Sequence, residues 1–303
     1  MIDRFIEHIS TELRYSELTV KNYRRDLEHF ATWWCSERGF EAGSFENFDV
    51  TAVTAQDVSD WVLYRIEVGK LAAATMNREL SSIKSFFRFL RSKDIVKSDI
   101  LKRIGSLKAA KVLPVFVPQS RMEEMLESVE ELSYERDFRS QRDSIIISLL
   151  YGCGIRLAEL LGIKVGHISG GAVKILGKGG KERIVPLLPE LTARIARYTA
   201  VCRQMGIELG SESKLIVGSK GKPLSRSTVQ RVVANQMQLS GIQGRKSPHV
   251  LRHTFATDLL RSGADMREIQ ELMGHSSLRS TQHYTHTSIS QLQDAYDKAH
   301  PHK

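Results

Sequence analysis

Six residues of the chain combine side chains that bind phosphate with one possible nucleophile: five have cationic or imidazole side chains, and the sixth is a tyrosine. They are Arg156, Lys178, His249, Arg252, His275 and Tyr284. Arginine, lysine and histidine neutralise phosphate oxygens and donate hydrogen bonds to them. The same groups stabilise the extra negative charge of a phosphorane transition state. A phenol beside them can act as a nucleophile, so these residue types predict attack on a phosphodiester.

Two of these residues have a spacing that indicates a shared helix face. His249 and Arg252 are three positions apart in a segment that starts at Pro248, a residue favoured in the first turn of a helix. The free N–H groups of such a first turn attract an anion. His275 follows Met273 and Gly274, which indicate the end of another helix.

Arg156 follows two glycines that interrupt a helical pattern, so we expect it where a new helix begins. Glu159 lies about one turn further and can orient its guanidinium. Lys178 lies in the glycine-rich segment Gly177–Lys181, predicted to be a turn from which a lysine side chain reaches a bound phosphate. Tyr284 comes nine residues after His275.

Each residue also has an ordinary structural interpretation. Arg156 can form a surface salt bridge, and Lys178 can be a solvated turn lysine. His249 can cap its helix, His275 can bond a helix-end carbonyl, and Tyr284 can pack in a core. The functional interpretation rests on the whole set, in order and at definite spacings.

A metal site is the alternative for the two histidines of one segment. His249 and His253 have the i, i+4 spacing of a zinc site, but Val-Leu-Arg stands between them and the glutamate of a zinc hydrolase is missing. The sequence therefore predicts no metal and no cofactor.

Bulk composition fits two ordinary globular domains. The chain has 303 residues, of which 41% are hydrophobic and 26% charged. Its apolar stretches are too short to cross a bilayer, and Asp3, Glu7 and Glu12 argue against a secretory signal. Three widely spaced cysteines suit free thiols in a reducing compartment. We therefore expect a cytoplasmic protein without membrane insertion.

The charge is distributed unevenly along the chain. Residues 1–64 hold 6 basic against 12 acidic side chains, and residues 65–111 hold 12 against 4. Residues 112–303 hold 26 against 19, and the whole chain has a net charge of +9. A solvated surface explains a modest excess, but the abrupt basic block favours a surface that follows a phosphate backbone.

The first 107 residues are predicted to form a helical domain. One long helix opens at Thr19, another is capped by Thr54, and a third covers Thr75–Leu90 with an aromatic stripe in the core. On the opposite face of the third helix we expect exposed basic residues suited to DNA, namely Arg78, Lys84, Arg88 and Arg91.

Residues 108–118 are predicted to be an extended linker, since they contain two prolines and no helical period. Residues 119–303 are predicted to form a second, mainly helical domain with a small antiparallel β-sheet. Its first helix is expected to be capped by Ser120, and its hairpin to join Ala172–Leu176 to Glu182–Val185. The remaining predicted helices are Arg142–Tyr151, Leu188–Met205, Ser225–Leu239, Pro248–Ser262, Asp265–Met273 and Ser288–Ala299.

Four stretches of the chain resemble the tyrosine recombinases of the lambda-integrase family, and most of all their Xer subfamily. They are Tyr151–Leu160, Gly177–Arg183, Ser247–Thr257, and Leu272–Leu278 followed by Tyr284–His286. The similarity extends over nearly the whole length. His-x-x-Arg followed 23 residues later by a histidine, and then by a tyrosine, is a highly specific series.

The resemblance implies a role for each of the six residues. Tyr284 would attack the scissile phosphate and form a 3′-phosphotyrosyl link, while Arg156 and Arg252 hold the non-bridging oxygens. Lys178, rather than the nearby Lys181, would protonate the leaving 5′ oxygen because it follows Gly177 directly. The two histidines, His249 and His275, would bond the phosphate, His249 being favoured as proton acceptor.

The resemblance also implies partners. A helical core-binding domain and a catalytic domain would form a C-shaped clamp on double-stranded DNA at a dif-like site. Four protomers would assemble, as a homo-tetramer or as a hetero-tetramer with a second recombinase, and a septal DNA translocase is a further expected partner. The amphipathic pattern of Ile289, Leu292, Ala295 and Tyr296 indicates an exchange helix donated to a neighbour, or packed in cis.

The resemblance implies resolution of chromosome dimers at cell division. The alternatives are an integrase of a phage or mobile element and a DNA-binding regulator without catalysis. The full catalytic set disfavours the regulator, and the lack of an arm-binding segment before residue 1 favours the chromosomal role over the integrase.

Overall fold

The computed structural model describes the chain except for residues 42, 103, 109–116, 136, 178–179 and 275–303. It divides into two compact units, Met1–Leu113 and Pro114–Lys303. Each unit has its own hydrophobic core. The division falls within residues 108–118, where the linker was predicted.

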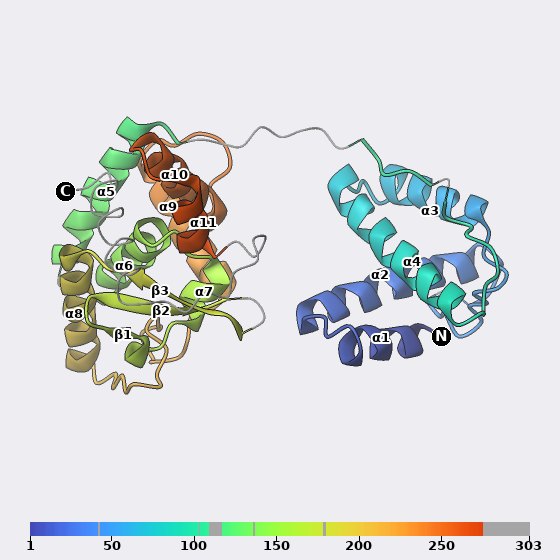
Figure 1. Cartoon of the computed structure of the whole chain (residues 1–303), viewed down its shortest axis with the longest axis horizontal. Coiled ribbons are helices and arrows are strands. Elements are labelled where there is room, and N and C mark those ends of the chain that lie inside the picture. Colours follow the sequence, from blue (N-terminus) through green and yellow to red (C-terminus); the bar gives the residue numbers. More distant parts are fainter. Residues whose placement is uncertain (42, 103, 109–116, 136, 178–179, 275–303) are drawn as a thin grey trace. The chain divides into compact units, whose positions relative to one another are not determined.

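The described residues of the first unit form a bundle of helices (Figure 1). Its core is aromatic, and Phe30, Trp61 and Phe86 are almost completely buried in it. Because helical periodicity places these rings on the inward faces, the polar residues between them face outward. The helices are α1 (Ile2–Thr11), α2 (Glu17–Ser36), α3 (Ala55–Glu67) and α4 (Ala73–Ser92).

Helix starts in this unit are set by capping side chains. Thr54 caps α3 as predicted, since its hydroxyl accepts from the Asp57 N–H while Asp57 accepts from the Thr54 N–H. The predicted start of α2 at Thr19 was wrong. Ser16 caps that helix by accepting from the Thr19 N–H, so α2 begins at Glu17.

The expectation of four exposed basic residues on α4 holds only in part. Arg78 is half-buried and bonds the carboxylate of Asp26, which is fully buried on α2. Lys84 is also half-buried and donates to the Ile104 carbonyl at 2.5 Å. Arg88 and Arg91 are exposed. Helical spacing identified the face, but long-range partners draw two of its cations inward.

The second unit combines helices with a small sheet, and the strands of this sheet alternate buried and exposed residues (Figure 1). The prediction that Ser120 caps its first helix was wrong, since the cap position is Pro118 and Ser120 lies inside the helix. The helices are α5 (Gln119–Tyr134), α6 (Phe138–Gly152), α7 (Leu157–Gly162), the short 3₁₀ helix η1 (Val165–His167), α8 (Pro189–Gln204), α9 (Arg226–Leu239), α10 (Pro248–Arg261) and α11 (Met266–Met273).

The sheet is antiparallel with the order β1-β2-β3. The predicted hairpin is confirmed as β2 (Ala172–Leu176) and β3 (Glu182–Pro186), with Ile175 opposite Arg183. The strand β1 (Ile168–Ser169) was missed because two residues carry no alternation pattern. The mainly α fold with a small antiparallel sheet is thus confirmed.

Leu107, just before the predicted linker, and Val117, near its end, pack in the two cores. Leu107 packs against the first core and exchanges two hydrogen bonds with the Asn77 side chain, at 2.7 and 2.9 Å. Val117 is fully buried in the second core. Residues 109–116 between them lie outside the described residues.

Candidate active site

Arg156 occupies the N-cap position of α7, immediately after the turn that ends α6. Gly154 in that turn has a φ of +55°, and a Cβ there would lie 2.3 Å from the Phe255 ring. Only glycine allows this approach, so the turn packs directly on α10. The predicted glycine break therefore presents Arg156 from a backbone that α10 holds in place.

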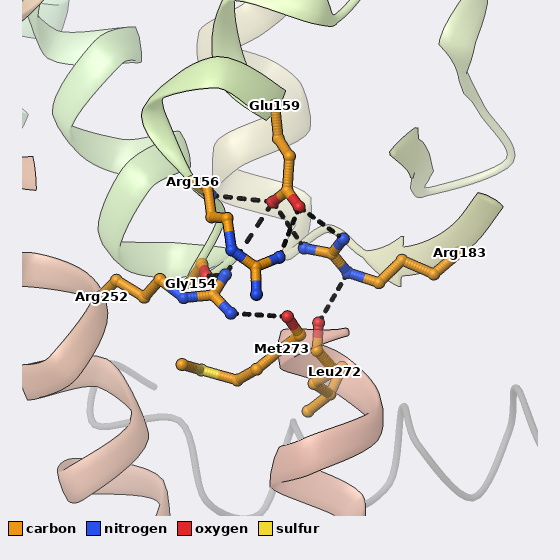
Figure 2. Close-up of polar contacts among 7 residues, drawn as sticks. All are labelled: Gly154, Arg156, Glu159, Arg183, Arg252, Leu272 and Met273. Atoms are coloured by element: carbon orange, nitrogen blue, oxygen red, sulfur yellow. Dashed lines mark hydrogen bonds and ion pairs between the residues drawn. The ribbon is translucent and has the colours of Figure 1, made fainter. Parts of the chain in front are cut away.

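Glu159 is the centre of the site (Figure 2). Its carboxylate accepts from the Arg156 side chain and from the Arg156 backbone N–H, both at 2.8 Å. Arg183 binds both carboxylate oxygens, at 3.0 and 2.8 Å. Arg252 approaches the same carboxylate to 3.9 Å. The expected contact between Glu159 and Arg156 is present, within a larger network than predicted.

Arg252 is held by backbone carbonyls as well. It is 5% exposed and donates to Gly154 in the turn before α7 and to Met273 at the end of α11. Two fixed acceptors leave its guanidinium little rotational freedom. It is therefore positioned before any ligand binds.

Arg183 was missed as a site residue, although its strand was predicted. It is buried on β3, where alternation places it on the same face as Val185 and opposite Ile175. A charged side chain at an inward position of a strand requires a partner. That position was the signal in the sequence that could have identified Arg183.

Burial, hydrogen bonds and neighbouring charges change the pKa of two groups in this cluster, Glu159 and Arg252. Burial alone would raise the pKa of Glu159, but hydrogen bonds from Arg183 and from the Arg156 backbone outweigh it and lower the pKa to about 2. Burial and the nearby Arg156 lower the pKa of Arg252 to about 10. Glu159 is thus an anion and Arg252 a cation at neutral pH.

His249 lies in the first turn of α10, as predicted, and its side chain is exposed. Its neighbour Ser247 occupies the N-cap position without a capping bond from its hydroxyl. His253 is exposed too. Within the described part of the chain there is no group of three or more His, Cys, Asp or Glu residues that could hold a metal ion.

Three predicted site residues, Lys178, His275 and Tyr284, lie outside the described residues. The structure therefore brings together Arg156 and Arg252 with Glu159 and Arg183, and places His249 on the same helix as Arg252. The position of Lys178 relative to Lys181 stays a prediction.

The arrangement has an excess of positive charge. Among the described residues, Arg156, Arg183 and Arg252 share one carboxylate, that of Glu159, in their ion pairs. Arg156 keeps 44% of its side chain exposed. A cluster of three guanidiniums and one carboxylate attracts a further anion, and its exposed member can contact one directly.

Family models match both units of the chain. The model described as the phage integrase family matches residues 116–291, and the phage integrase N-terminal SAM-like domain matches residues 2–94. The chain belongs to the phage integrase family. All six predicted site residues lie within the first of these matches.

Relatives narrow the assignment within the family. "Tyrosine recombinase XerC" of Pelobacter propionicus is 36% identical over 306 residues, which cover 99% of this chain and 95% of the relative. The protein of the same name in Thermodesulfovibrio yellowstonii is 33% identical over 305 residues, covering 99% and 96%. The chain is a tyrosine recombinase of the Xer subfamily, as the resemblance predicted.

Solved structures of the family have the same fold. XerH recombinase in a pre-cleavage complex with its difH substrate matches with a TM-score of 0.67 and 19% identity, covering 97% of this chain and 84% of that one. A lambda integrase dimer on a core site also has a TM-score of 0.67, with 17% identity, covering 94% of this chain and 98% of that one.

Nowhere in the described residues is a helix long and apolar enough to cross a membrane.

Proposed function

We propose that this site-specific DNA recombinase resolves chromosome dimers by cutting and rejoining duplex DNA through a 3′-phosphotyrosyl intermediate. Its relatives at 33% identity and above that cover nearly the whole chain carry the name XerC, which favours the chromosomal role over a mobile-element integrase. The reaction would take place on chromosomal DNA in the cytoplasm.

The observation that carries this proposal is the arginine cluster around Glu159. Arg252 is fixed by two backbone carbonyls, and Arg156 is fixed by Glu159 while 44% of its side chain stays exposed. We assign them to the two non-bridging oxygens of the scissile phosphate. A phosphorane carries one more negative charge than the diester, so the excess positive charge stabilises the transition state more than the substrate.

The other four roles complete the reaction. Tyr284 attacks the phosphorus, and its bond to phosphorus forms as the bond to the 5′ oxygen breaks. A phenol with a pKa near 10 needs a base at neutral pH, and the exposed His249 is assigned to accept its proton. Lys178 donates a proton to the leaving 5′ oxygen, and His275 bonds the phosphate. The phosphotyrosyl link conserves the bond energy, so rejoining needs no cofactor.

Assembly on DNA follows from the reaction, because exchange between two duplexes requires four active protomers. A lambda integrase tetramer has been solved on a Holliday junction, and XerH on difH. We assign residues 1–107 to a core-binding domain, 108–118 to a linker and 119–303 to the catalytic domain with its exchange helix. A dif-like site, a second recombinase and a septal translocase are the proposed partners.

A nicked DNA site tests the proposal. A nick next to the scissile phosphate lets the 5′-hydroxyl fragment leave, so the covalent protein–DNA adduct accumulates and survives denaturant. We expect an adduct from the wild-type protein on the host's dif-like site. Tyr284→Phe should bind the same DNA and form no adduct, because the nucleophilic oxygen is missing.

Two results would contradict the proposal. An adduct of undiminished yield from Tyr284→Phe would exclude Tyr284 as the nucleophile. A wild-type protein that shifts DNA in gels but forms no adduct on any site would indicate a binding protein without catalysis.

A further inference from the structure

We infer that Arg183 is a positioning residue for recombination. It holds Glu159 and the end of α11 in a fixed relative orientation, and this aligns the two arginines assigned to the phosphate, Arg156 and Arg252. The inference rests on the proposed function. It concerns a side chain that is 7% exposed and therefore acts through its neighbours rather than on DNA.

The contacts of Arg183 leave its guanidinium a single orientation. Its Nη1 and Nη2 bind the two oxygens of Glu159, at 3.0 and 2.8 Å, and its Nε donates to the Leu272 carbonyl at 2.8 Å. One planar group thus joins β3, α7 and the C-terminal end of α11 (Figure 2). A lysine ammonium, being a point charge, cannot reproduce these three directions together.

Each contact of Arg183 leads to a phosphate-binding arginine. Glu159, once fixed, binds the side chain and backbone of Arg156. The end of α11, once fixed, presents the Met273 carbonyl to Arg252. Arg183 therefore connects to Arg156 through a carboxylate and to Arg252 through one helix end.

Two glycines lie beside the Arg183 guanidinium, and the contact with Gly274 is the tighter one. A Cβ at Gly274, the residue after α11, would lie 3.0 Å from Arg183 Nη1. At Gly177, the residue after β2, a Cβ would lie 3.3 Å from the Lys181 carbonyl and 3.9 Å from Arg183 Nη1. The chain runs on from Gly274 to His275 and from Gly177 to Lys178. Arg183 thus lies against both segments that lead to further proposed site residues.

The competing explanation is a structural ion pair that only stabilises the unit. The first unit provides a matched control, because Arg65 binds both oxygens of the buried Glu79 at 3.0 and 2.7 Å and is 18% exposed. Arg183→Lys and Arg65→Lys make the same chemical change at an arginine that binds both oxygens of a buried glutamate, through Nη1 and Nη2 in Arg183 and through Nε and Nη2 in Arg65. Only the first lies in the proposed site.

The experiment measures single-turnover adduct formation on nicked DNA at saturating protein, together with the Kd for DNA. For Arg183→Lys we expect a rate about 100-fold below wild type, since a small misalignment of reacting groups has effects of this size. Its Kd should stay within about threefold, because phosphate contacts spread over the whole interface dominate affinity. Arg65→Lys should keep the wild-type rate.

A double variant covers the case in which Arg183→Lys does not fold. Glu159→Gln with Arg183→Met removes both charges of the pair, so neither is left buried without the other, and Arg252 keeps its two carbonyl acceptors. Urea unfolding checks that this variant is folded. Positioning predicts that this variant stays slow, because Arg156 and the end of α11 are no longer held. A purely structural pair predicts a recovered rate.

The outcomes are distinguishable. A wild-type protein that forms no adduct contradicts the proposed function and this inference with it. An active wild type together with Arg183→Lys within threefold of its rate, an equal loss in Arg65→Lys, or a double variant of wild-type rate contradicts this inference alone.

Discussion

The two units both bury carboxylates against arginines, but the excess of positive charge is larger in the second unit. In the first unit, two buried carboxylates, those of Asp26 and Glu79, meet Arg65, Arg78 and the more exposed Arg25. In the second, one carboxylate meets three arginines beside an exposed surface. The comparison separates an ion-pair network that holds a fold together from one that retains charge for a ligand.

In the network of the first unit, each buried carboxylate has an arginine bound to it. Glu79 is bound by Arg65 and approached by Arg78 to 3.6 Å, while Asp26 is bound by Arg78 and accepts from Ser82 at 2.9 Å. Both carboxylates are almost completely buried. Asp26 Oδ1 accepts no hydrogen bond from the described residues and lies 3.6 Å from Arg25. Breaking the bond from Arg78 would therefore leave Asp26 a buried charge with little compensation.

The network of the second unit has more positive charge than its one carboxylate can neutralise. Glu159 neutralises one of three guanidiniums, and Arg156 remains 44% exposed. Burial, followed by repulsion from Arg156 and Arg183, lowers the pKa of Arg252 to about 10. A bound phosphate relieves this repulsion, so binding energy and charge balance favour the same ligand.

The largest expected effect is a loss of cleavage activity when an arginine of the second network is changed. Arg156→Lys should lower the cleavage rate about 1,000-fold, because an ammonium cannot reproduce the guanidinium contact and loss of a transition-state donor has effects of this order. Stability should change by less than about 0.5 kcal/mol, since the side chain is partly exposed. Single-turnover cleavage and urea unfolding measure the two quantities.

Arg156→Lys with nearly wild-type cleavage would contradict the idea that unused charge in the second unit serves catalysis. Arg121→Lys on α5 is a suitable control, because it changes an exposed arginine of the same unit that pairs with exposed Glu124. It should leave both the rate and the stability unchanged.

The opposite pattern is expected in the first unit. Arg78→Met should destabilise the protein by about 3 kcal/mol, because the fully buried Asp26 loses its main partner. The cleavage rate at saturating protein should stay within about threefold of wild type, since no reacting group is touched. Unfolding in urea followed by tryptophan fluorescence suits this unit, whose helices carry Trp33, Trp34 and Trp61.

A neutral effect of Arg78→Met on stability would show that the pair does not hold the bundle. Asp26→Asn in the same background removes the orphaned charge and should recover part of the lost stability. A further loss in the double variant would instead point to packing.

Local patterns in the sequence predicted the elements and the positions of two site arginines. The glycine break placed Arg156 at a helix start, and the Pro248 segment placed Arg252 on a helix with His249, because each signal acts within one turn of chain. The Thr54 cap was predicted for the same reason. The roles of Lys178, His275 and Tyr284 stay predictions.

Long-range pairing was not predictable in the same way. Arg183 meets Glu159 from 24 residues away, and Arg78 meets Asp26 from 52 residues away. Periodicity specifies which face a side chain occupies, but not which charge lies across the core. Arg78 was therefore expected on the surface, and Arg183 was overlooked inside its strand.

A smaller effect is expected on the free energy of unfolding at acidic pH. The pKa of Glu159 is lowered from 4.5 to about 2 in the fold, so its ionised form stabilises the native state above pH 4.5. That stabilisation is lost as the pH falls from 4.5 toward 2. Between pH 6 and pH 3 the expected loss from this group is about 2 kcal/mol.

The measurement is the free energy of unfolding at several pH values for the wild type and for Glu159→Gln. Glutamine does not titrate, so the variant should lose about 2 kcal/mol less than the wild type over this range. Parallel pH curves would mean that Glu159 is not held as an anion by its arginines.

A substitution at Gly274 tests how tightly the second network is packed. Gly274 has a φ of +63°, and a Cβ there would lie 3.0 Å from Arg183 Nη1. Gly274→Ala should therefore cost about 1 to 2 kcal/mol for the left-handed backbone, plus the displacement of a guanidinium held by Glu159 and Leu272. Cleavage should slow as well, since Arg183 has to shift.

Gly263→Ala isolates the second contribution. Gly263 has a φ of +89° after α10, and nothing lies within 4 Å of a Cβ at that position. It should show the backbone cost alone and leave the cleavage rate unchanged. Because the two variants share the strained backbone, any excess in Gly274→Ala reports the contact with Arg183. Equal losses in both variants would mean that the guanidinium can give way, and that the second network is looser than its hydrogen bonds imply.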